Sequence, residues 1–505
     1  MNRACWTCRS RTIQCDQSRS PCAKCEKAAL ECFDKRPLRW VKGVAIRGKM
    51  RGHLYEDPDS NKMSKSQMQR VKRQKWVSTS ATKCLTAENE MPVFALQDPR
   101  ISNLDRASRY YMDYYSNRIC KLFILYDSER NPFRHLLSYA LEDSTLQQCI
   151  LALAARHFAN TGKSFDQANL AVSLRFAHAK MDAIHFKRQT IGALSRQLTH
   201  PELGKKDPTM ATILLLIFLD LLESGIDGWD YHLQGAKSLV TLYQSLTGPC
   251  ASSESEDPGD TAHEMRRFID RQFSLIATLG ATLSSPKSRS EFFISGDGNK
   301  HQESIVRSFL GCPEFILKAI HFFSNQRGLI SGSRIHEIVY DADVRDTVAM
   351  LQLTENFNCV EWASDFRRSS SSPVNVQNLS TLSLAYKTAA LLYGRRVLGA
   401  FKATVPDNED LVMQLLVLID ELKSDMTLFK CLLWPTFIAG LECQTEAQQN
   451  LVLQSMRMLW DLTNCLNIIS ASKILRGRWK EKRSTGSPMH DGPDLYRIDR
   501  DWLLI

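Results

Sequence analysis

The stretch Cys5–Cys32, CWTCRSRTIQCDQSRSPCAKCEKAALEC, holds six of the fifteen cysteines of this 505-residue chain. Two thiolates spaced C-x2-C can bind one metal ion from a single turn, which is the usual start of a zinc site. A segment this short has no hydrophobic core, so metal binding would supply its folding free energy. Three cysteines follow a C-x2-C-x6-C spacing and the next three repeat it: Cys5, Cys8 and Cys15, then Cys22, Cys25 and Cys32.

The repeat predicts how six sulfurs hold two metal ions. Two tetrahedral zinc ions need eight ligand positions, so two cysteines must bridge both metals. By the symmetry of the repeat, the bridging residues are the first cysteines of the two triplets, Cys5 and Cys22. The other sulfurs divide between the ions, Cys8 and Cys15 on one and Cys25 and Cys32 on the other. The sequence therefore predicts two Zn²⁺ per chain.

The residues between the cysteines resemble the binuclear zinc cluster DNA-binding domain of fungal transcription regulators. Arg9 and Arg11 follow the second cysteine, Asp16 follows the third, and a proline precedes the fourth. In that family the first short helix enters the major groove, and basic residues between the second and third cysteines read a short G/C-rich triplet. The resemblance implies that Arg9 and Arg11 contact bases.

Two features depart from the family pattern. Thr12 and Gln14 stand where lysines are usual, and Pro21 lies directly before Cys22 rather than one residue earlier. A lysine can donate to guanine O6 and N7, whereas threonine is shorter and suits a thymine methyl or a single hydrogen bond. We expect Thr12 and Gln14 to lie at the DNA, with a triplet preference that differs from the usual CGG or is looser than it.

Positive charge is concentrated at the N-terminus. Residues 1–80 carry 19 Lys and Arg against 7 Asp and Glu, and the remaining residues carry 46 against 48, within a whole-chain net charge of +10. A basic module beside a near-neutral body is typical of phosphate binding, because each neutralised phosphate releases counterions. The residues predicted to hold phosphates are Lys24, Lys27, Arg47, Lys49 and Arg51.

A second basic run follows at Arg70, Lys72, Arg73 and Lys75. Its composition fits a nuclear import signal and fits a phosphate-binding face equally well. The resemblance to transcription regulators implies that the protein acts in the nucleus. Between residues 63 and 77 no sustained heptad of apolar residues occurs, so the sequence shows no coiled-coil dimerisation helix there.

From about residue 100 the chain has the composition and helical periodicity of a large core. Ser144–Gln147 fits a capping box, and Asp207-Pro208 fits an N-cap followed by proline. The apolar run Ile213–Leu222 is interrupted by Asp220 and is too short to span a bilayer, so it predicts a buried helix. Strand patterns are scarce. The predicted fold is mostly α, a small zinc cluster followed by an all-α body.

Composition divides the chain into four parts. We expect the zinc cluster at 1–34, a basic and largely irregular arm at 35–100, the all-α body at 101–475 and a terminal loop and tail at 476–505. Polar breaks at 249–260, 367–378 and 476–494 predict surface loops. The final acidic and apolar residues, 499–505, fit either a coactivator contact or a segment that docks back onto the body, and docking is the commoner fate.

A second resemblance lies in the body. Tyr114-Tyr115, Asn131-Pro132-Phe133, Leu151–His157 and Trp229–Lys237 follow the order seen in a fungal-specific transcription factor regulatory domain, over roughly residues 105–470. The resemblance implies a helical domain that regulates, in some relatives by binding metabolites or partner proteins. For Trp229 and His232 we favour helix packing over a ligand site.

Together these features predict a zinc-dependent, sequence-specific regulator of RNA polymerase II transcription, of a biosynthetic gene cluster or a metabolic pathway. The expected partners are double-stranded DNA, a second copy or another regulator, and the transcription machinery, with no membrane. The alternative is an enzyme or ligand-sensing protein with a structural zinc knuckle. We expect no enzymatic activity. The candidate phosphate loop at Gly162-Lys163-Ser164 has His157 where the leading glycine belongs.

Overall fold

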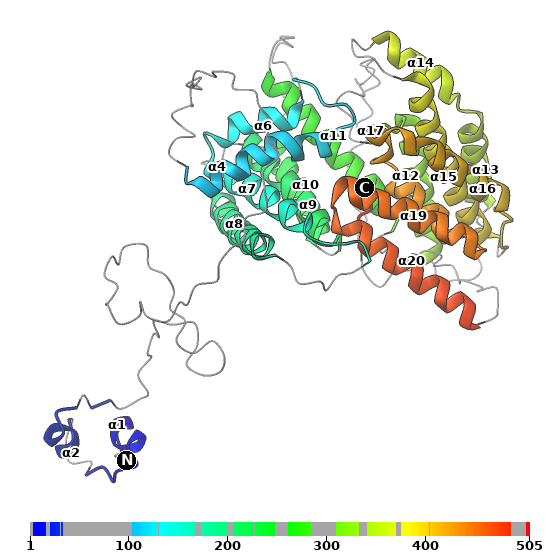
Figure 1. Ribbon diagram of the computed structural model, residues 1–505. Helices are drawn as coiled ribbons and strands as arrows, with labels where there is room; N and C mark the ends of the chain where they lie inside the picture. The colour runs from blue at the N-terminus through cyan, green and yellow to red at the C-terminus, as the bar shows by residue number, and fades with distance from the viewer. Residues whose placement is uncertain are drawn as a thin grey trace, which may run out of the picture. The chain divides into compact units, whose positions relative to one another are not determined.

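The computed structural model separates into two compact units, Met1–Val93 and Phe94–Ile505, and each is described by itself. The first unit contains α1 (Trp6–Ser10) and α2 (Ala23–Lys27), and the second contains all the other described helices (Figure 1). The described residues are 4–16, 21–30, 32–33, 104–129, 131–166, 173–199, 206–226, 228–247, 261–283, 310–332, 341–369, 375–402, 404–485 and 501–505.

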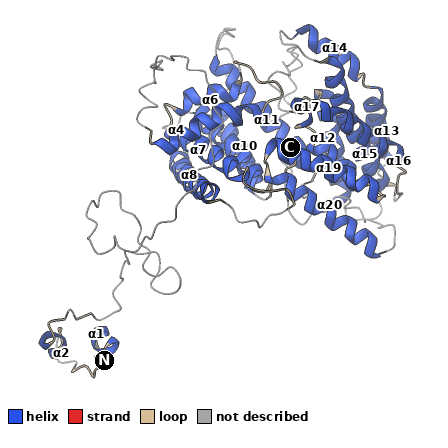
Figure 2. Ribbon diagram, in the orientation of Figure 1, coloured by secondary structure: helices blue, strands red, loops and turns tan. Residues whose placement is uncertain are grey.

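The second unit, here called the helical body, confirms the mostly α prediction. In the described part of the chain the only β-type pairing is an isolated bridge, and the regular elements are helices (Figure 2). These are α4 (Arg106–Tyr114), η1 (Tyr115–Ile119), α5 (Cys120–Leu122), α6 (Pro132–Ala140), α7 (Ser144–Asn160), α8 (Leu174–Thr199), α9 (Lys206–Glu223), α10 (Gly228–Thr247), α11 (Thr261–Ala281), α12 (Glu314–Gly332), α13 (Asp341–Asn356), α14 (Cys359–Ser369), α15 (Val376–Phe401), α16 (Glu409–Glu421), η5 (Leu422–Ser424), α17 (Met426–Phe429), α18 (Leu433–Glu442), α19 (Glu446–Thr463) and α20 (Leu466–Thr485).

The first half of the body is built around α7 and α9. Both helices are apolar on nearly every face, and α9 is buried continuously over residues 208–222, which includes the run Ile213–Leu222 that the sequence predicts to be buried. A helix that is hydrophobic all round belongs in a core. Helix α8 packs along α7, and α10 packs along α9. Among the described residues, no helix has both the length and the apolarity needed to cross a bilayer.

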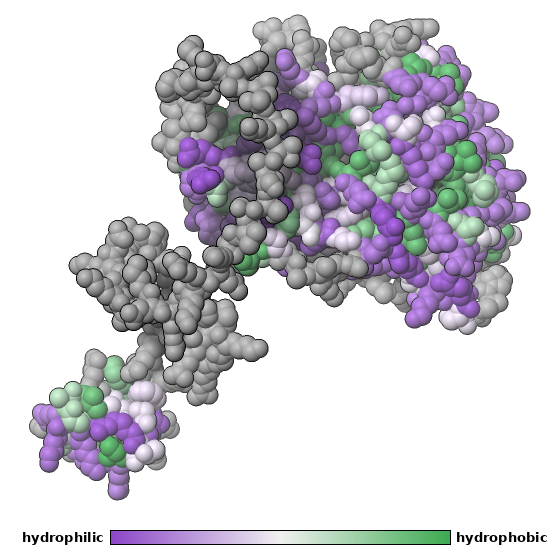
Figure 3. Space-filling model, in the orientation of Figure 1, coloured by the Kyte–Doolittle hydropathy of each residue, from purple (hydrophilic) through white to green (hydrophobic). Residues whose placement is uncertain are grey.

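The second half is built around α15, which α12, α13, α14, α16 and α18 surround. The hydroxyl of Tyr386 on α15 donates to the Cys431 carbonyl at 2.7 Å, which satisfies a buried polar group. The absent side chain of Gly394 leaves room for the Phe323 ring of α12. On the face shown in Figure 3, hydrophilic side chains dominate the described surface and hydrophobic ones are scattered.

Buried hydrogen bonds join the two halves into one body. His157 on α7 lies 3.1 Å, by its Nε2, from the Thr463 carbonyl at the end of α19. The amide of Asn160 donates both to the Leu222 carbonyl and to the Asn464 carbonyl, at 2.8 and 3.0 Å. Because both side chains are buried, these bonds fix the contact between segments about three hundred residues apart in sequence.

The last residues dock back onto the body, which confirms the commoner of the two expectations for the tail. Trp502 forms the isolated bridge with Ile226, and the Leu503 amide donates to the Gly225 carbonyl at 2.9 Å. The indole of Trp229 donates to the Asp501 carbonyl at 3.3 Å. Leu503 and Leu504 are fully buried, so these residues of the tail are part of the core.

The short motifs of the body have structural roles. The hydroxyl of Tyr114 lies 2.8 Å from Nδ1 of His157. Asn131 caps α6 by accepting the Phe133 amide, and its own amide donates to the Cys120 carbonyl. These contacts hold helix ends and fill the core.

Trp229 and His232 likewise serve packing. The ring of Trp229 lies over Gly280, where an added Cβ would meet it at 2.3 Å. His232 lies 3.6 Å from the carboxylate of the buried Asp220. This contact joins α10 to α9 and supports the packing interpretation that the sequence favoured.

Two predicted helix starts are wrong by one or two residues. The N-cap of α7 is Asp143, whose carboxylate accepts the amides of the first turn at 2.9 Å. The capping box expected Ser144 to accept the Gln147 amide, but this amide donates to the Asp143 backbone carbonyl, and the Gln147 side chain donates to the Ala140 carbonyl. Helix α9 begins at Lys206, so Asp207 lies inside the first turn, where its carboxylate binds Arg266.

Two predicted loops are shorter than expected. Helix α20 continues to Thr485, so the expected loop from residue 476 is wrong over its first ten residues. The cause is Trp479, which is buried and whose indole donates to the Gly440 carbonyl at 2.8 Å. The break expected at 367–378 is helical at both ends, because α14 runs to Ser369 and α15 starts at Val376. The break at 249–260 lies outside the described residues.

Candidate metal centre

The six cysteines of the N-terminal unit, here called the six-sulfur cluster, are positioned by two short helices of the same design. Cys5 is the N-cap of α1 and Cys8 lies within it, while Cys22 is the N-cap of α2 and Cys25 lies within it. The sulfur of Cys5 accepts the Cys8 amide at 3.3 Å. The remaining sulfurs come from the segments that follow each helix, at Cys15 and Cys32.

The seventeen-residue repeat of the sequence reappears in the backbone. The Ile13 amide donates to the Cys8 carbonyl, and the Leu30 amide donates to the Cys25 carbonyl, each at 3.0 Å. Each short helix ends with a residue in the left-handed conformation, at φ 57° for Thr12 and φ 48° for its counterpart seventeen positions later. This hydrogen-bond pattern is the Schellman ending of a helix. The two halves therefore present their sulfurs in equivalent ways.

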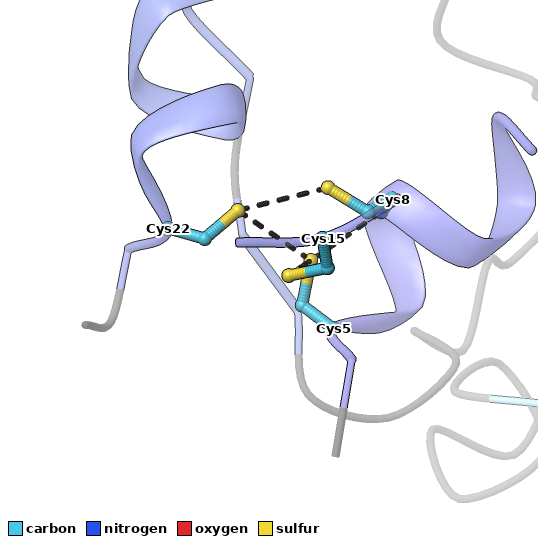
Figure 4. Close-up of side chains that lie close together, drawn as sticks. All are labelled: Cys5, Cys8, Cys15 and Cys22. Atoms are coloured by element: carbon cyan, nitrogen blue, oxygen red, sulfur yellow. Dashed lines mark hydrogen bonds between the residues drawn. The ribbon is translucent and has the colours of Figure 1, made fainter. Parts of the chain in front are cut away.

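The six sulfurs form two groups of four that share two members. Within each group, one sulfur atom per residue lies within 4.8 Å of every other, and Figure 4 shows the side chains of the first group turned toward one another. The shared members are Cys5 and Cys22, the bridging pair that the repeat predicts. The groups are Cys5, Cys8, Cys15 and Cys22, and Cys5, Cys22, Cys25 and Cys32.

The sulfur separations fit tetrahedral zinc. A Zn–S bond of about 2.3 Å gives a tetrahedron whose sulfurs are about 3.8 Å apart. The sulfur of Cys5 lies 3.8 Å from those of Cys22, Cys25 and Cys15, and Cys8 lies 3.6 Å from Cys22. The sulfurs of Cys8 and Cys25, which belong to different groups, also lie 3.8 Å apart, so it is the groups of four and not single distances that identify the shared pair. Thiolates are also the donors that zinc prefers in closed structural sites. The donor set and its spacing therefore both fit the metal.

The thiols differ in how readily they ionise. Burial opposes ionisation of Cys5, but hydrogen bonds from the Cys8 amide and from neighbouring thiols set its pKa below the ordinary value. The Cys25 amide chiefly lowers the pKa of Cys22. Burial instead raises the pKa of Cys8 to about 12 and raises that of Cys25. A metal ion binds thiolates, so metal binding must release protons and must weaken in acid.

Hydrogen bonds outside the cysteines close the unit, and the sequence did not predict them. The Trp6 amide donates to the Phe33 carbonyl at 2.6 Å, and the Phe33 amide donates to the Thr7 hydroxyl at 3.1 Å. The carboxylate of Asp16 accepts the Ala23 amide at 3.1 Å, at the start of α2. Asp16 is not the N-cap residue of α2, which is Cys22, so its contact has no signal in the local sequence. The two hydrogen bonds of Phe33 likewise have no signal in the sequence.

The residues predicted to contact DNA surround α1 and α2 and are exposed. Arg9 lies in α1, and Arg11 is its C-cap residue rather than part of the helix. Thr12 donates its hydroxyl to the Arg11 carbonyl at 2.7 Å, so the next residue after the cap is held in a fixed position. The exposed residues of this set are Arg9, Arg11, Thr12, Gln14, Lys24 and Lys27.

The other predicted contacts and the import candidate lie outside the described residues. They are Arg47, Lys49, Arg51, Arg70, Lys72, Arg73 and Lys75. Their roles remain predictions from the sequence.

Comparisons with known proteins agree with both resemblances. Residues 3–40 match the family described as Fungal Zn(2)-Cys(6) binuclear cluster domain, and residues 109–504 match the family described as Fungal specific transcription factor domain. The chain is similar to the acriflavine sensitivity control protein acr-2 of Neurospora crassa, at 24% identity over 382 residues. That stretch covers 72% of this chain and 60% of the relative, so the chain spans less than two thirds of the relative's length. No solved structure shows significant similarity to the chain.

Proposed function

The chain belongs to the fungal specific transcription factor family and carries that group's binuclear cluster, and from this membership we propose that it regulates RNA polymerase II transcription at specific DNA sites in the nucleus. It is a DNA-binding transcription regulator that holds two zinc ions. Three details go beyond family membership and are our proposal: the polymerase, the nuclear location and the kind of genes regulated. We propose that these genes belong to a biosynthetic gene cluster or a metabolic pathway. The observation that carries it is the pair of four-sulfur groups sharing Cys5 and Cys22.

We assign the bridging positions to Cys5 and Cys22. The two zinc ions supply structural cross-links and no reaction. Cys5 lies at the start of α1 and Cys8 lies within it, so metal binding by these two residues would hold the first turn of the helix in place. A helix held at its first turn by metal ligands points its other end in one direction, which is the requirement for reading base edges.

We assign base reading to the end of α1. Arg9 and Arg11 are exposed there, and an arginine can donate two hydrogen bonds to guanine O6 and N7. Thr12 and Gln14 follow them and are exposed as well. Because threonine offers a methyl group and one hydroxyl, it supports a preference that differs from CGG at one position.

Phosphate contacts are assigned to the exposed lysines of α2, Lys24 and Lys27, and to the arginines and lysine of the arm, Arg47, Lys49 and Arg51. Such contacts position a protein on the duplex and carry no sequence information. One small cluster buries little DNA surface, so useful specificity needs a second bound module on a paired half-site. A second copy of the chain or another regulator can supply that module.

The first test measures zinc in the purified full chain. Elemental analysis is expected to give two zinc ions per chain, and Cys22→Ser is expected to lose both, because its sulfur belongs to both groups. The sulfur of Cys8 belongs to one group only, so Cys8→Ser is expected to lose fewer zinc ions than Cys22→Ser. Cys359→Ser, a cysteine of the helical body, serves as the matched control and keeps two. One zinc per native chain would contradict the bridged arrangement.

The second test separates this function from the alternative of an enzyme or ligand sensor with a zinc knuckle. Binding selection from random duplex DNA is expected to enrich one short site with the zinc-loaded chain and none after chelation. If the zinc-loaded chain enriches no DNA sequence, the result would favour the enzyme or ligand sensor. Mapping bound sites in the genome against transcripts lost on deletion then identifies the regulated pathway.

A further inference from the structure

Helix α8 carries an apolar stripe that faces away from the core. Five large apolar side chains are exposed along it, at spacings of seven, three, seven and seven residues. Figure 1 shows α8 at the outer edge of the body, next to α7. The members of this α8 stripe, with the exposed fraction of each, are Leu174 (76%), Met181 (63%), Ile184 (47%), Ile191 (44%) and Leu198 (40%).

The stripe is separate from the face with which α8 packs on the body. The packing face consists of small side chains and one leucine, and they are buried: Ala179, Ala183, Thr190 and Leu194. The stripe instead follows heptad spacing, as in the seam of a coiled coil: Leu174 and Met181 share one position of the repeat, and Ile184, Ile191 and Leu198 share the other. Arg188 and Ser195 occupy the first of these positions in the later repeats. A helix of 26 residues is about 39 Å long, enough for more than three such repeats.

Gly192, like Gly235 and Gly477, lies in open space, so it leaves room for a close partner at this face of α8 without itself indicating one. It lies inside α8, next to Ile191, and a Cβ added there would meet no atom within 4 Å. A glycine within a helix lowers helix stability, and here the packing of the body does not require one. A glycine at the surface of a helix allows another backbone to approach closely. Its position beside the stripe places that approach at the same face.

The charges around the stripe select the kind of partner. Arg188 lies on the stripe, one heptad after Met181, Lys180 and Arg196 lie beside it, and all three, here called the basic rim, are exposed. Within the described part of the chain none of the three forms an ion pair. The only acidic residue of α8 is Asp182, whose carboxylate already accepts the Tyr111 hydroxyl at 2.7 Å. The rim of the stripe is therefore basic.

We propose that the α8 stripe docks an amphipathic helix of a partner protein, with apolar residues at heptad spacing and acidic residues beside them. Carboxylates at the flanking positions would meet the basic rim, as opposite charges do between paired helices. A second copy of α8 is the poorer occupant. In an antiparallel pair that sets Leu174 against Leu198, the basic residues of one helix would lie beside those of the other, and like charges disfavour pairing.

The test uses the full zinc-loaded chain and two labelled peptides, in the absence of DNA, so that it is independent of the proposed DNA-binding function. Both peptides are 28 residues long with isoleucine and leucine at the two core positions of each heptad. One carries glutamate at the flanking positions and the other carries lysine. Fluorescence anisotropy is expected to show the glutamate peptide binding at least tenfold more tightly, with an affinity that falls as salt is added.

Variants then locate the binding site. Ile184→Ser combined with Ile191→Ser is expected to weaken the glutamate peptide at least tenfold, and because both side chains are exposed the melting temperature should stay unchanged. Leu353→Ser, an equally exposed apolar residue of α13, is the matched control and should bind as the native chain does. Arg188→Glu combined with Arg196→Glu is expected to reverse the preference between the peptides.

Three outcomes would overturn the proposal. The first is equal binding of both peptides, which would remove the role of the basic rim. The second is equal weakening by Leu353→Ser, which would show nonspecific contact. The third is self-association of the native chain in sedimentation that Ile191→Ser abolishes, which would assign the stripe to a second copy.

Discussion

The buried imidazole of His157 makes the stability of the helical body depend on pH in a defined window. Its Nε2 faces the Thr463 carbonyl, which can only accept, so Nε2 carries the proton and Nδ1 accepts the Tyr114 hydroxyl. Burial is the main cause that lowers the pKa of His157 from 6.5 to about 4. The folded protein therefore holds the ring neutral in a range of pH where the unfolded chain takes up a proton.

The sign and the size of the effect follow from the two pKa values. The pKa is lower in the folded state, so the contribution to stability is complete above pH 6.5 and is lost as the pH falls toward 4. One pKa unit corresponds to about 1.4 kcal/mol, so the full loss is about 3 kcal/mol below pH 4. At pH 5 the loss is about 2 kcal/mol.

Urea denaturation of the full chain, followed by circular dichroism at pH 7 and pH 5, measures this loss. His157→Gln cannot take up the proton, so its free energy of unfolding is expected to fall by about 2 kcal/mol less than that of the native chain over this interval. His185→Gln, at an exposed position of α8, is the matched control and should follow the native chain. Equal losses in the native chain and in His157→Gln would refute the reasoning.

Three further predictions concern the DNA-binding unit and the core. Arg11→Ala is expected to cost about 1–3 kcal/mol of binding free energy on the best site and to reduce the difference in affinity between matched and mismatched DNA. Lys27→Ala should weaken binding to all sequences alike and reduce the slope of log affinity against log salt concentration by about one. Titrations of both variants at several salt concentrations, on matched and scrambled duplexes, compare these effects. Thr12→Lys is expected to shift the site selected from random DNA toward CGG, and a strict CGG preference of the native chain would rule out a role for Thr12. Gly280→Ala is expected to lower stability by about 1–3 kcal/mol, because its Cβ would meet the Trp229 ring at 2.3 Å, whereas Gly235→Ala, in open space on α10, should raise it by about 0.5–1 kcal/mol; thermal melts of both variants check the contrast.

The parts of the structure that the sequence predicts are those set by local spacing. The C-x2-C-x6-C repeat predicts which sulfurs are shared, because the same spacing on the same short helix gives the same placement twice. The apolar run Ile213–Leu222 predicts a buried helix, since a helix without a polar face has no side to expose. Both depend on neighbours within a few turns of the chain.

Features that depend on distant neighbours could not be predicted. No local pattern connects His157 with Thr463, which are 306 positions apart. The extent of α20 depends on the burial of Trp479 and on its hydrogen bond to the Gly440 carbonyl, and the highly charged stretch 476–485 gives no local sign of this contact. Some local choices were also ambiguous, because Asp143 and Ser144 can each cap a helix and only the folded backbone shows which one does.

The bonds that Asn160 and His157 form with the end of α19 also affect how genetic deletions should be interpreted. A chain that stops before Thr463 retains the residues of α7 and α9 but loses the Thr463 and Asn464 carbonyls, so Nε2 of the buried His157 loses its partner, the buried Asn160 amide loses one of its two acceptors, and apolar surface is uncovered. Such an allele is expected to lower protein abundance through misfolding and degradation. Loss of reporter expression in a C-terminal deletion series therefore does not locate an activating segment. Point variants at exposed positions, with protein levels measured in parallel, are the appropriate way to map one.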